Sequence, residues 1–288
     1  MKRLLLSLLV AVGSVAVLVG AGRTQPPELR ISLAVLPCTN IELTFRKFNP
    51  LLQYLKETAG LTVKLVVPGD IDEAEAKLKN GQVDIVLQDP HTFSLLLPLF
   101  DPATLLQAIA LDGSTSQTGV VVVRRDSGIS NLAQLRGRAV MFGPRASTSK
   151  WVAARMLFED RGLNPDLDVK SIKGGCCEDI AFAVTIHSVD AGLVCEHFMG
   201  QQEARLAELG ADANALRVIA HTPPFPTRIL AARLGARPEK FERLARALLA
   251  MSMANPREAR VLRSAEVLGF RPTTEAKYLG ALRAARLP

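Results

Sequence analysis

The sequence predicts an α/β protein with two lobes. Short runs of β-branched residues alternate with segments of helical periodicity after residue 28. The chain has 288 residues, 48% of them hydrophobic and 22% charged, which is typical of globular domains. The alternation occurs in two stretches, one up to about residue 115 and one over about 119–220, followed by a strand and terminal helices. This order predicts a cleft between two lobes, with strand-end residues facing it.

The individual elements follow from local patterns. Strands are predicted at 29–36, 62–68, 83–88, 119–124, 138–143, 168–174, 190–195 and 229–234. The first predicted helix, 50–60, places its leucines on one face and ends at a glycine, and the second, 71–81, opens with acids and closes with lysines. A third helix is expected at about 148–161, and two or three more within 238–288.

The N-terminus has the pattern of a secretory signal. Lys2 and Arg3 precede an uninterrupted apolar run that ends at the small residues Val19-Gly20-Ala21. We therefore expect a cleaved signal segment over residues 1–21. The alternative is a retained N-terminal membrane anchor, which the length of the run allows. No cysteine follows the run, so no lipid-anchor signal is expected.

The chain is basic, with 35 Lys and Arg against 28 Asp and Glu. Most of the excess positive charge lies in residues 237–288. Solvated helix faces or a docking surface for an acidic partner would account for this charge. Nucleic acid is not an expected partner, because an exported chain with 5% aromatic residues offers no stacking platform.

Several segments together resemble the phosphate, phosphite and phosphonate substrate-binding proteins of ABC uptake systems. The most specific is RRDSGISNLAQLRGRAVMFGPRASTSKWVAARMLFEDRGLNP (124–165), which combines DSGI, a short helix, GRAVMFG and STS. Further matching segments are FNPLLQYLKETAGLTVKLVV (48–67), NGQVDIVLQDPHTF (80–93), GGCCED (174–179), SVDAGLV (188–194) and RVIAHTPPFPTRILAARL (217–234).

This resemblance implies a type 2 periplasmic binding-protein fold that closes on one small ligand and presents it to an ABC permease. Lobe 1 would comprise 29–117 and 223–288, and lobe 2 would comprise 118–222. It also implies a periplasmic location, no catalysis and no cofactor. The sequence agrees, since it contains no G-x-S-x-G elbow, Walker loop or H-E-x-x-H motif.

The STS turn is the expected anion cradle. Ser147, Thr148 and Ser149 lie between a strand and the start of a helix, where hydroxyls and free backbone N–H groups converge. The resemblance implies that this turn holds ligand oxygens, which supports its interpretation as an anion-binding site. Simple N-capping of the helix needs only one of the hydroxyls. Arg145 and Lys150 flank the turn, either as helpers or as solvated side chains.

The resemblance places further ligand contacts on positions where this chain departs from its relatives. His91 stands where an aromatic contact is usual, and it is either a hydrogen-bond donor, a metal ligand or a loop residue bonded to backbone. Cys177 stands in place of a ligand-binding His and Glu178 in place of the following Asp. Cys195 stands where an acidic contact is usual.

The cysteines allow three interpretations, one of them a mixed case in which one disulfide shapes the cleft while one or two free thiols and the STS turn hold a ligand such as arsenite. In an oxidising compartment they would form one or two disulfides, for example between Cys38 and either Cys176 or Cys177. Alternatively, Cys38, Cys177 and Cys195 would line a site for a soft centre such as trivalent arsenic or Cu(I). Because several thiolates would repel a phosphate or phosphonate, the second interpretation favours a thiophilic ligand such as arsenite over a plain oxyanion.

The sequence does not decide whether the bound ligand is passed to a transporter or reported to a sensor. A substrate-binding protein for an ABC transporter is the family default. The same fold could instead report ligand occupancy to a membrane sensor kinase. An enzyme is the least supported class, since its nucleophile would have to be one of the cysteines.

Overall fold

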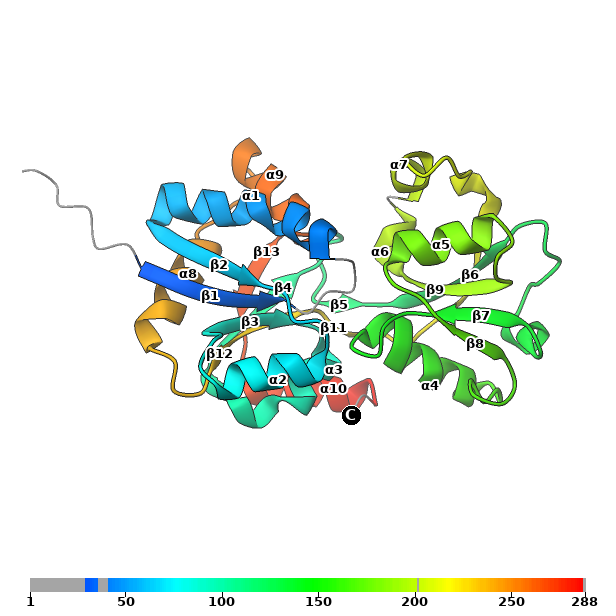
Figure 1. Ribbon diagram of the computed structural model, residues 1–288, viewed down its shortest axis with the longest axis horizontal. Helices are drawn as coiled ribbons and strands as arrows, with labels where there is room; N and C mark the ends of the chain where they lie inside the picture. The colour runs from blue at the N-terminus through cyan, green and yellow to red at the C-terminus, as the bar shows by residue number, and fades with distance from the viewer. Residues whose placement is uncertain (1–28, 36–40, 201, 287–288) are drawn as a thin grey trace, which may run out of the picture.

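The computed structural model describes residues 29–35, 41–200 and 202–286, and it has two lobes that lie side by side (Figure 1). The predicted signal segment 1–21 and Cys38 lie outside the described residues. Within the described ranges, no helix combines the length and the apolar character needed to cross a membrane.

The first lobe contains both ends of the described chain. Its elements are β1 (Leu29–Val35), α1 (Ile41–Ala59), β2 (Leu61–Val66), α2 (Ile71–Lys79), β3 (Ile85–Gln88), α3 (Pro90–Leu95), η1 (Leu97–Leu99), β4 (Phe100–Ile109), β12 (Ile229–Arg233), α8 (Pro238–Leu249), α9 (Pro256–Ser264), β13 (Gly269–Pro272) and α10 (Glu275–Ala284). The strands form one sheet in the order β13-β4-β12-β3-β1-β2, in which β1 pairs in parallel with β2 and β3. Helices α1, α8 and α9 cover one face of this sheet, and α2, α3 and α10 cover the other (Figure 1).

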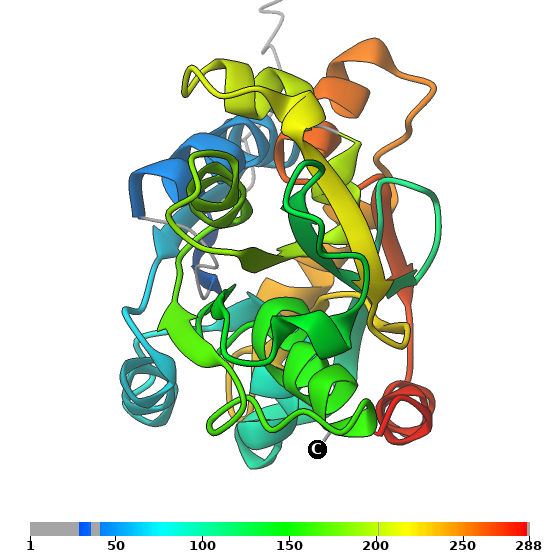
Figure 2. The ribbon, with the colours of Figure 1, turned by 90° about the vertical axis from the view of Figure 1, so that its right-hand side faces the viewer.

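The second lobe is the continuous middle of the chain. Its elements are β6 (Gly119–Arg124), η2 (Leu132–Leu135), β7 (Ala139–Phe142), η3 (Thr148–Val152), α4 (Ala153–Asp160), β8 (Lys170–Lys173), α5 (Cys177–Thr185), β9 (Ala191–Cys195), α6 (Glu196–Met199), α7 (Gln202–Ala207), η4 (Ala213–Ala215) and β10 (Leu216–His221). The sheet order is β10-β6-β9-β7-β8, with β7 parallel to both β8 and β9. Figure 2 looks from this lobe toward the first.

Two crossings connect the lobes. The chain leaves the first lobe through β5 (Ser116–Gln117) and returns through β11 (Phe225–Pro226). These two short strands pair antiparallel, with Phe225 opposite Gln117 and Pro226 opposite Ser116. The crossings therefore form one paired hinge. The predicted α/β class and two-lobed architecture are both confirmed.

The core explains why valine runs mark the central strands. Val120, Val121, Val122 and Val123 of β6 are all completely buried. Val121 and Val123 pack toward α4, whereas Val120 and Val122 pack toward α5. Because helices cover both faces of the sheet, a continuous apolar run replaces the alternation of a half-exposed strand.

All eight predicted strands are present, but two other predictions needed correction. The first helix begins at Ile41 rather than at Pro50, so the proline lies inside α1. Pro50 removes one backbone hydrogen bond, whereas Phe48, Leu51 and Leu55 pack α1 into the core on both sides of the proline. The ten-residue strand β4 was not predicted, because Asp101 and Pro102 near its start are typical of turns.

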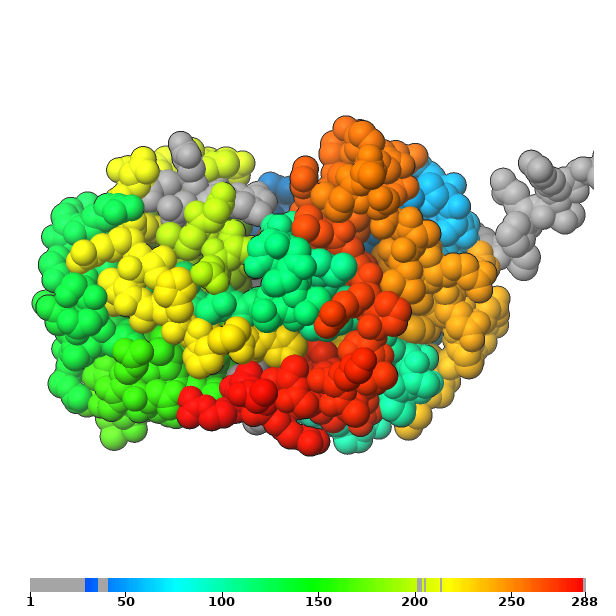
Figure 3. Space-filling view, turned by 180° about the vertical axis from the view of Figure 1, so that it is seen from behind, coloured from blue at the N-terminus to red at the C-terminus, as the bar shows by residue number. Residues whose placement is uncertain are grey.

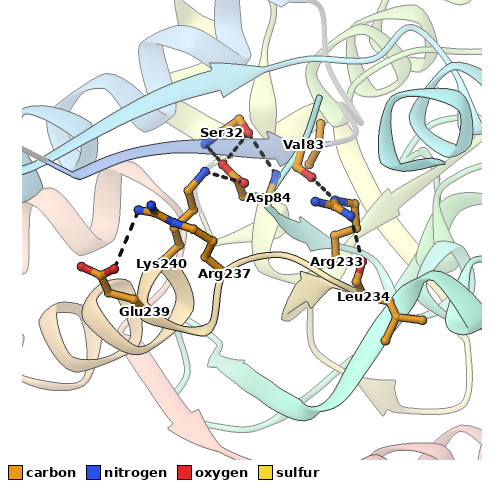
Figure 4. Close-up of polar contacts among 8 residues, drawn as sticks. All are labelled: Ser32, Val83, Asp84, Arg233, Leu234, Arg237, Glu239 and Lys240. Atoms are coloured by element: carbon orange, nitrogen blue, oxygen red, sulfur yellow. Dashed lines mark hydrogen bonds and ion pairs between the residues drawn. The ribbon is translucent and has the colours of Figure 1, made fainter. Parts of the chain in front are cut away.

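A buried carboxylate, that of Asp84, ties the first lobe together just before β3 (Figure 4). Asp84 accepts hydrogen bonds from the backbone N and the hydroxyl of Ser32, each 2.8 Å long. Lys240 of α8 adds an ion pair of 2.6 Å. Asp84 therefore joins β1, β3 and α8.

Candidate functional site

A cavity of about 360 Å³ lies between the lobes and is lined by both. That volume suits a small molecule. The first lobe and the hinge contribute Lys47, Asp89, Ala108, Ile109, Ala110, Leu111, Asp112, Ser116, Gln117, Thr227, Arg228, Glu266 and Val267. The second lobe contributes Thr118, Ser149, Lys150, Cys177, Glu178, Cys195, Glu196, His197 and Phe198.

The STS turn forms the start of η3, a single π-helical turn that leads into α4. The Ser147 hydroxyl accepts a hydrogen bond of 3.2 Å from the backbone N of Lys150 and so caps this turn. Ser149 lines the cavity, whereas Ser147 is completely buried and lies 3.4 Å, oxygen to oxygen, from Ser149. The turn thus presents one hydroxyl to the cavity and uses another as the cap.

Thr148 joins the two lobes. Its hydroxyl accepts a hydrogen bond of 3.1 Å from the backbone N of His91, and its own backbone N donates to Asp89 at 3.2 Å. Thr148 is completely buried and does not line the cavity. The middle residue of the turn therefore holds the second lobe against the loop after β3.

Two glycines let the turn approach the neighbouring strands. A Cβ atom on Gly119 would lie 2.6 Å from the carbonyl oxygen of Ser149. A Cβ atom on Gly143 would lie 2.4 Å from the Cβ of Lys150. Any larger residue at either position would push the turn out of place.

Two thiols continue the site from Ser149. Cys177 begins α5 and Cys195 ends β9, so both lie at the cavity edge of the second sheet. The Cys195 sulfur lies 3.2 Å from the Ser149 hydroxyl, and the Cys195 backbone N donates to the Cys177 sulfur at 3.3 Å. Hydroxyl and two sulfurs form a continuous row along one wall.

The two thiols differ in acidity. The hydrogen bond from Cys195 and the charge of Lys150 lower the pKa of Cys177, although burial opposes them. The same hydrogen bond, together with burial, raises the pKa of Cys195 well above its ordinary value. Cys177 is therefore the more acidic thiol of the pair.

Cys176 has a different role from its neighbour. Its sulfur accepts a hydrogen bond of 3.4 Å from the backbone N of Asp179, and the Asp179 carboxylate accepts one from the backbone N of Cys176, so the two residues cap α5. Burial raises the pKa of Cys176 to about 12. Cys176, Cys177 and Cys195 are all free thiols, so the described residues contain no disulfide.

Lys150 is a site residue that the sequence marked only as a flank of the turn. Its side chain is 1% exposed and its ammonium donates a hydrogen bond of 2.9 Å to the carbonyl of Gly175. Lys150 is therefore a buried part of the site and not a solvated side chain beside the turn. A buried cation at this wall stabilises the neighbouring thiolate.

The opposite wall carries charges from distant parts of the chain. Lys47 of α1 pairs with Glu266 at 2.7 Å, and Arg228 donates to the carbonyl of Ala265 at 2.9 Å. Burial alone would raise the pKa of Glu266, but the charges of Lys47, His197 and Arg228 hold it at about 2. His197 belongs to the second lobe, so this electrostatic contact crosses the cavity.

Of the remaining predicted site residues, one lines the cavity and one does not. Glu178 lines the cavity beside Cys177. His91 does not line it, and its Nδ1 is buried without a hydrogen-bond partner among the described residues. Burial lowers the pKa of His91, and the nearby charge of Asp89 opposes this effect. No group of three or more His, Cys, Asp or Glu side chains that could hold a metal ion is found in the part of the chain that the structure describes.

Sequence reasoning missed Lys47, Arg228 and Glu266. Tertiary packing within the first lobe brings them together, and only Arg228 lies in one of the matching segments, 217–234. Asp89 and Glu196 could have been predicted from the sequence, because each directly follows a predicted strand and the ends of these strands were expected to face the cleft. A rule that treats every polar residue after a parallel strand as a candidate would have included both.

Two α/β lobes, a paired two-strand hinge and a ligand-sized cavity between the lobes define a periplasmic binding protein of the two-crossover type. More specifically, the chain belongs to the family of periplasmic phosphonate substrate-binding proteins of ABC transporters, which matches residues 33–278. The predicted family is thereby confirmed. Its members are binding components of transporters, not enzymes.

Several solved structures have a similar fold. A binding component of an ABC phosphonate transporter from Pseudomonas aeruginosa has a TM-score of 0.77 at 19% identity, over 90% of this chain and 86% of that one. PhnD1 from Prochlorococcus marinus, in complex with methylphosphonate, has a TM-score of 0.75 at 15% identity, over 90% and 99%. A Xanthomonas citri protein bound to ATP has a TM-score of 0.69 at 22% identity, over 89% and 96%.

Proposed function

We propose that this protein is an exported receptor that captures a small thiophilic oxyacid, with arsenous acid as the best fit, and presents it to an ABC permease. The observation that carries the proposal is the row formed by Ser149, Cys195 and Cys177 along one wall of the cavity. Thiolates select soft centres, and a hydroxyl next to them suits an oxygen on the same centre.

The chemistry of capture balances without a further reactant. Arsenous acid, As(OH)₃, forms one As–S bond with Cys177 and one with Cys195, and two As–O bonds break. The departing hydroxides leave as two waters, taking one proton from each cysteine. When Cys177 is already a thiolate, its proton comes from solvent. The third As–OH group remains and hydrogen-bonds to the Ser149 hydroxyl.

The charges around the cavity favour an uncharged ligand over a phosphonate dianion. Five carboxylates line the cavity against three cations, and one of the cations, Lys47, is paired with Glu266. A dianion would be repelled by this set, whereas arsenous acid is neutral near pH 7. PhnD1, with its methylphosphonate, is therefore a guide to the fold and not to the ligand of this chain.

Capture would proceed by closure of the lobes about the hinge. We propose that residues 29–117 with 223–288 move as one body and residues 118–222 as the other. Both bodies contribute to the cavity wall, so closure adds contacts to the ligand and shields it from water. Export through a signal segment at 1–21 is part of the same proposal.

Titration of the reduced protein with sodium arsenite and with methylphosphonate tests the proposal. Trp151, the single tryptophan of the chain, lies in η3 and gives an intrinsic fluorescence signal close to the site. We expect saturable arsenite binding that Cys195→Ser and Cys177→Ser each weaken more than about tenfold, because one As–S bond is lost.

Cys176→Ser is the matched control for these variants. It removes a thiol from the same segment, and serine also serves as an N-cap, so arsenite affinity should stay within about twofold of wild type. Arsenite binding by Cys195→Ser as tight as that of wild type would overturn the proposal. So would methylphosphonate binding that is tighter than arsenite binding in the wild-type protein.

A further inference from the structure

A second hollow lies behind the hinge. It has a volume of about 510 Å³, and its walls come from both crossings and from the C-terminal part of the first lobe. We call it the hinge pocket and define it by Thr115, Ser116, Pro223–Pro226, Arg271, Lys277 and Ala281. In Figure 3, which views the molecule from behind, the returning crossing (yellow) runs beside α10 (red).

The lining of the hinge pocket combines apolar residues with two cations and several uncharged polar residues. Four residues in a row, Pro223 to Pro226, contribute proline rings and the ring of Phe225. Arg271 and Lys277 are exposed and lie in the same wall, and no Asp or Glu is among the residues that line the pocket. Flat apolar surfaces beside unopposed positive charge fit an aromatic ring that bears an acidic group.

The Arg271 guanidinium is held in a fixed position. Its Nη2 and Nε atoms donate hydrogen bonds of 3.0 Å and 3.3 Å to the Gln107 side-chain oxygen. The Gln107 side-chain nitrogen in turn donates to the carbonyl of Thr115 at 2.8 Å. A preorganised guanidinium loses little conformational entropy when it binds a carboxylate or sulfonate.

Hydrogen bonds connect the hinge pocket to the interlobe cavity. The Tyr278 hydroxyl, which belongs to the pocket lining, donates a hydrogen bond of 2.6 Å to the carbonyl of Thr227. The Thr227 hydroxyl donates to the carbonyl of Ala108 at 2.5 Å, and both residues line the interlobe cavity. All residues that line the hinge pocket lie within 29–117 and 223–288, so the pocket belongs to the first lobe.

We propose that the hinge pocket binds a small aromatic carboxylate or sulfonate. Among the lining residues, Ser116 alone is shared with the interlobe cavity. The proposal does not depend on what the interlobe cavity binds.

The probe is 8-anilinonaphthalene-1-sulfonate, an aromatic sulfonate whose fluorescence rises on binding. We expect saturable binding of one probe per chain, weakened at least about tenfold by Lys277→Glu, which reverses a charge in the wall. Ala281→Trp should block the pocket by filling it. Arg283→Glu is the matched control, because it makes the same charge change on α10 outside the pocket, and it should change the affinity less than about twofold.

Two outcomes would overturn the proposal. Equal probe affinity in Lys277→Glu and Arg283→Glu would place the probe elsewhere and refute the site. Probe binding by Ala281→Trp as tight as that of wild type would refute it as well. The measurement uses no arsenite, so its result is distinguishable from failure of the proposed function.

Discussion

The sulfur of Cys195 lies 3.2 Å from the hydroxyl oxygen of Ser149, although the two residues come from different elements. Ser149 belongs to the turn that relatives are expected to use for ligand oxygens, and Cys195 stands at the end of β9. Their contact places an oxygen-binding group and a soft ligand on the same wall. The predictions below follow from this wall and from the contacts that support it.

The three described thiols should react at different rates. Cys177 has a lowered pKa and Cys176 has one raised to about 12, so iodoacetamide at pH 7.5 should label Cys177 first and Cys176 last. Mass spectrometry of peptides from the native reduced protein measures the order. Lys150→Met should slow labelling of Cys177 several-fold, because it removes the charge that stabilises the thiolate. Labelling of Cys176 as fast as Cys177 would contradict the assignment.

The ion pair between Lys47 and Glu266 should set the charge selectivity of the cavity. Glu266→Gln removes one negative charge and leaves Lys47 without its partner. Methylphosphonate affinity should then rise by about fivefold, which corresponds to roughly 1 kcal/mol for one charge across a solvated cleft. Arsenite affinity should be nearly unchanged, because arsenous acid is neutral. Isothermal titration calorimetry with both ligands measures this, and Lys47→Gln is the reverse control, which should weaken methylphosphonate binding.

The close approach of β6 to the STS turn should be intolerant of a side chain. Gly119→Ala places a Cβ 2.6 Å from the Ser149 carbonyl oxygen, so the turn must move. We expect a loss of about 1–3 kcal/mol in the free energy of unfolding, together with weaker arsenite binding. Gly280→Ala on α10 is the control, since no atom lies within 4 Å of its added Cβ and a helical Ala is favourable. Urea denaturation compares the two variants, and equal stability would contradict the packing argument.

The buried pair of Asp84 and Lys240 should contribute to stability in a pH-dependent way. Burial alone would raise the pKa of Asp84, but bonds from Lys240 and Ser32 lower it overall. A carboxyl whose folded-state pKa is lowered stabilises the fold above its unfolded pKa, about 3.9, and that stabilisation is lost as the pH falls below this value. Asp84→Asn should therefore cost about 2–3 kcal/mol at pH 7 and less at pH 3.

Glu239→Gln is the control for the Asp84 prediction. Glu239 pairs with Arg237 at 3.7 Å on the surface of the same region, and both side chains are more than half exposed (Figure 4). Its loss should change the free energy of unfolding by less than about 0.5 kcal/mol at either pH. An Asp84→Asn variant as stable as Glu239→Gln at pH 7 would show that the buried pair contributes nothing.

The sequence predicted those parts of the site that depend on local pattern. Four predicted residues line the cavity: Ser149, Cys177, Glu178 and Cys195. They lie near the ends of strands and helices, and valine runs and turn residues in the sequence indicate where those elements end. The family resemblance added the expectation that these positions face a ligand. Strand ends in one sheet meet at one edge, so local signals were sufficient for this wall.

Other features could not be read from the sequence because they depend on tertiary packing. Lys47 and Glu266 lie far apart in the chain and pair only where α1 meets the turn before β13. Thr148 looked like a ligand residue, but its hydroxyl is taken by the backbone of His91 in the other lobe. A polar side chain at a strand end can face the cavity or form a hydrogen bond within the protein. Contacts with the neighbouring lobe determine which of the two occurs, and local sequence patterns do not encode these contacts.

The most direct test of the thiophilic cavity is arsenic X-ray absorption spectroscopy on the arsenite-loaded, reduced protein. The account predicts a first shell of two sulfur atoms and one oxygen around arsenic, and replacement of one sulfur by oxygen in Cys195→Ser. A shell of oxygen atoms alone in the wild type, as in free arsenous acid, would contradict the assignment of Cys177 and Cys195 as ligands.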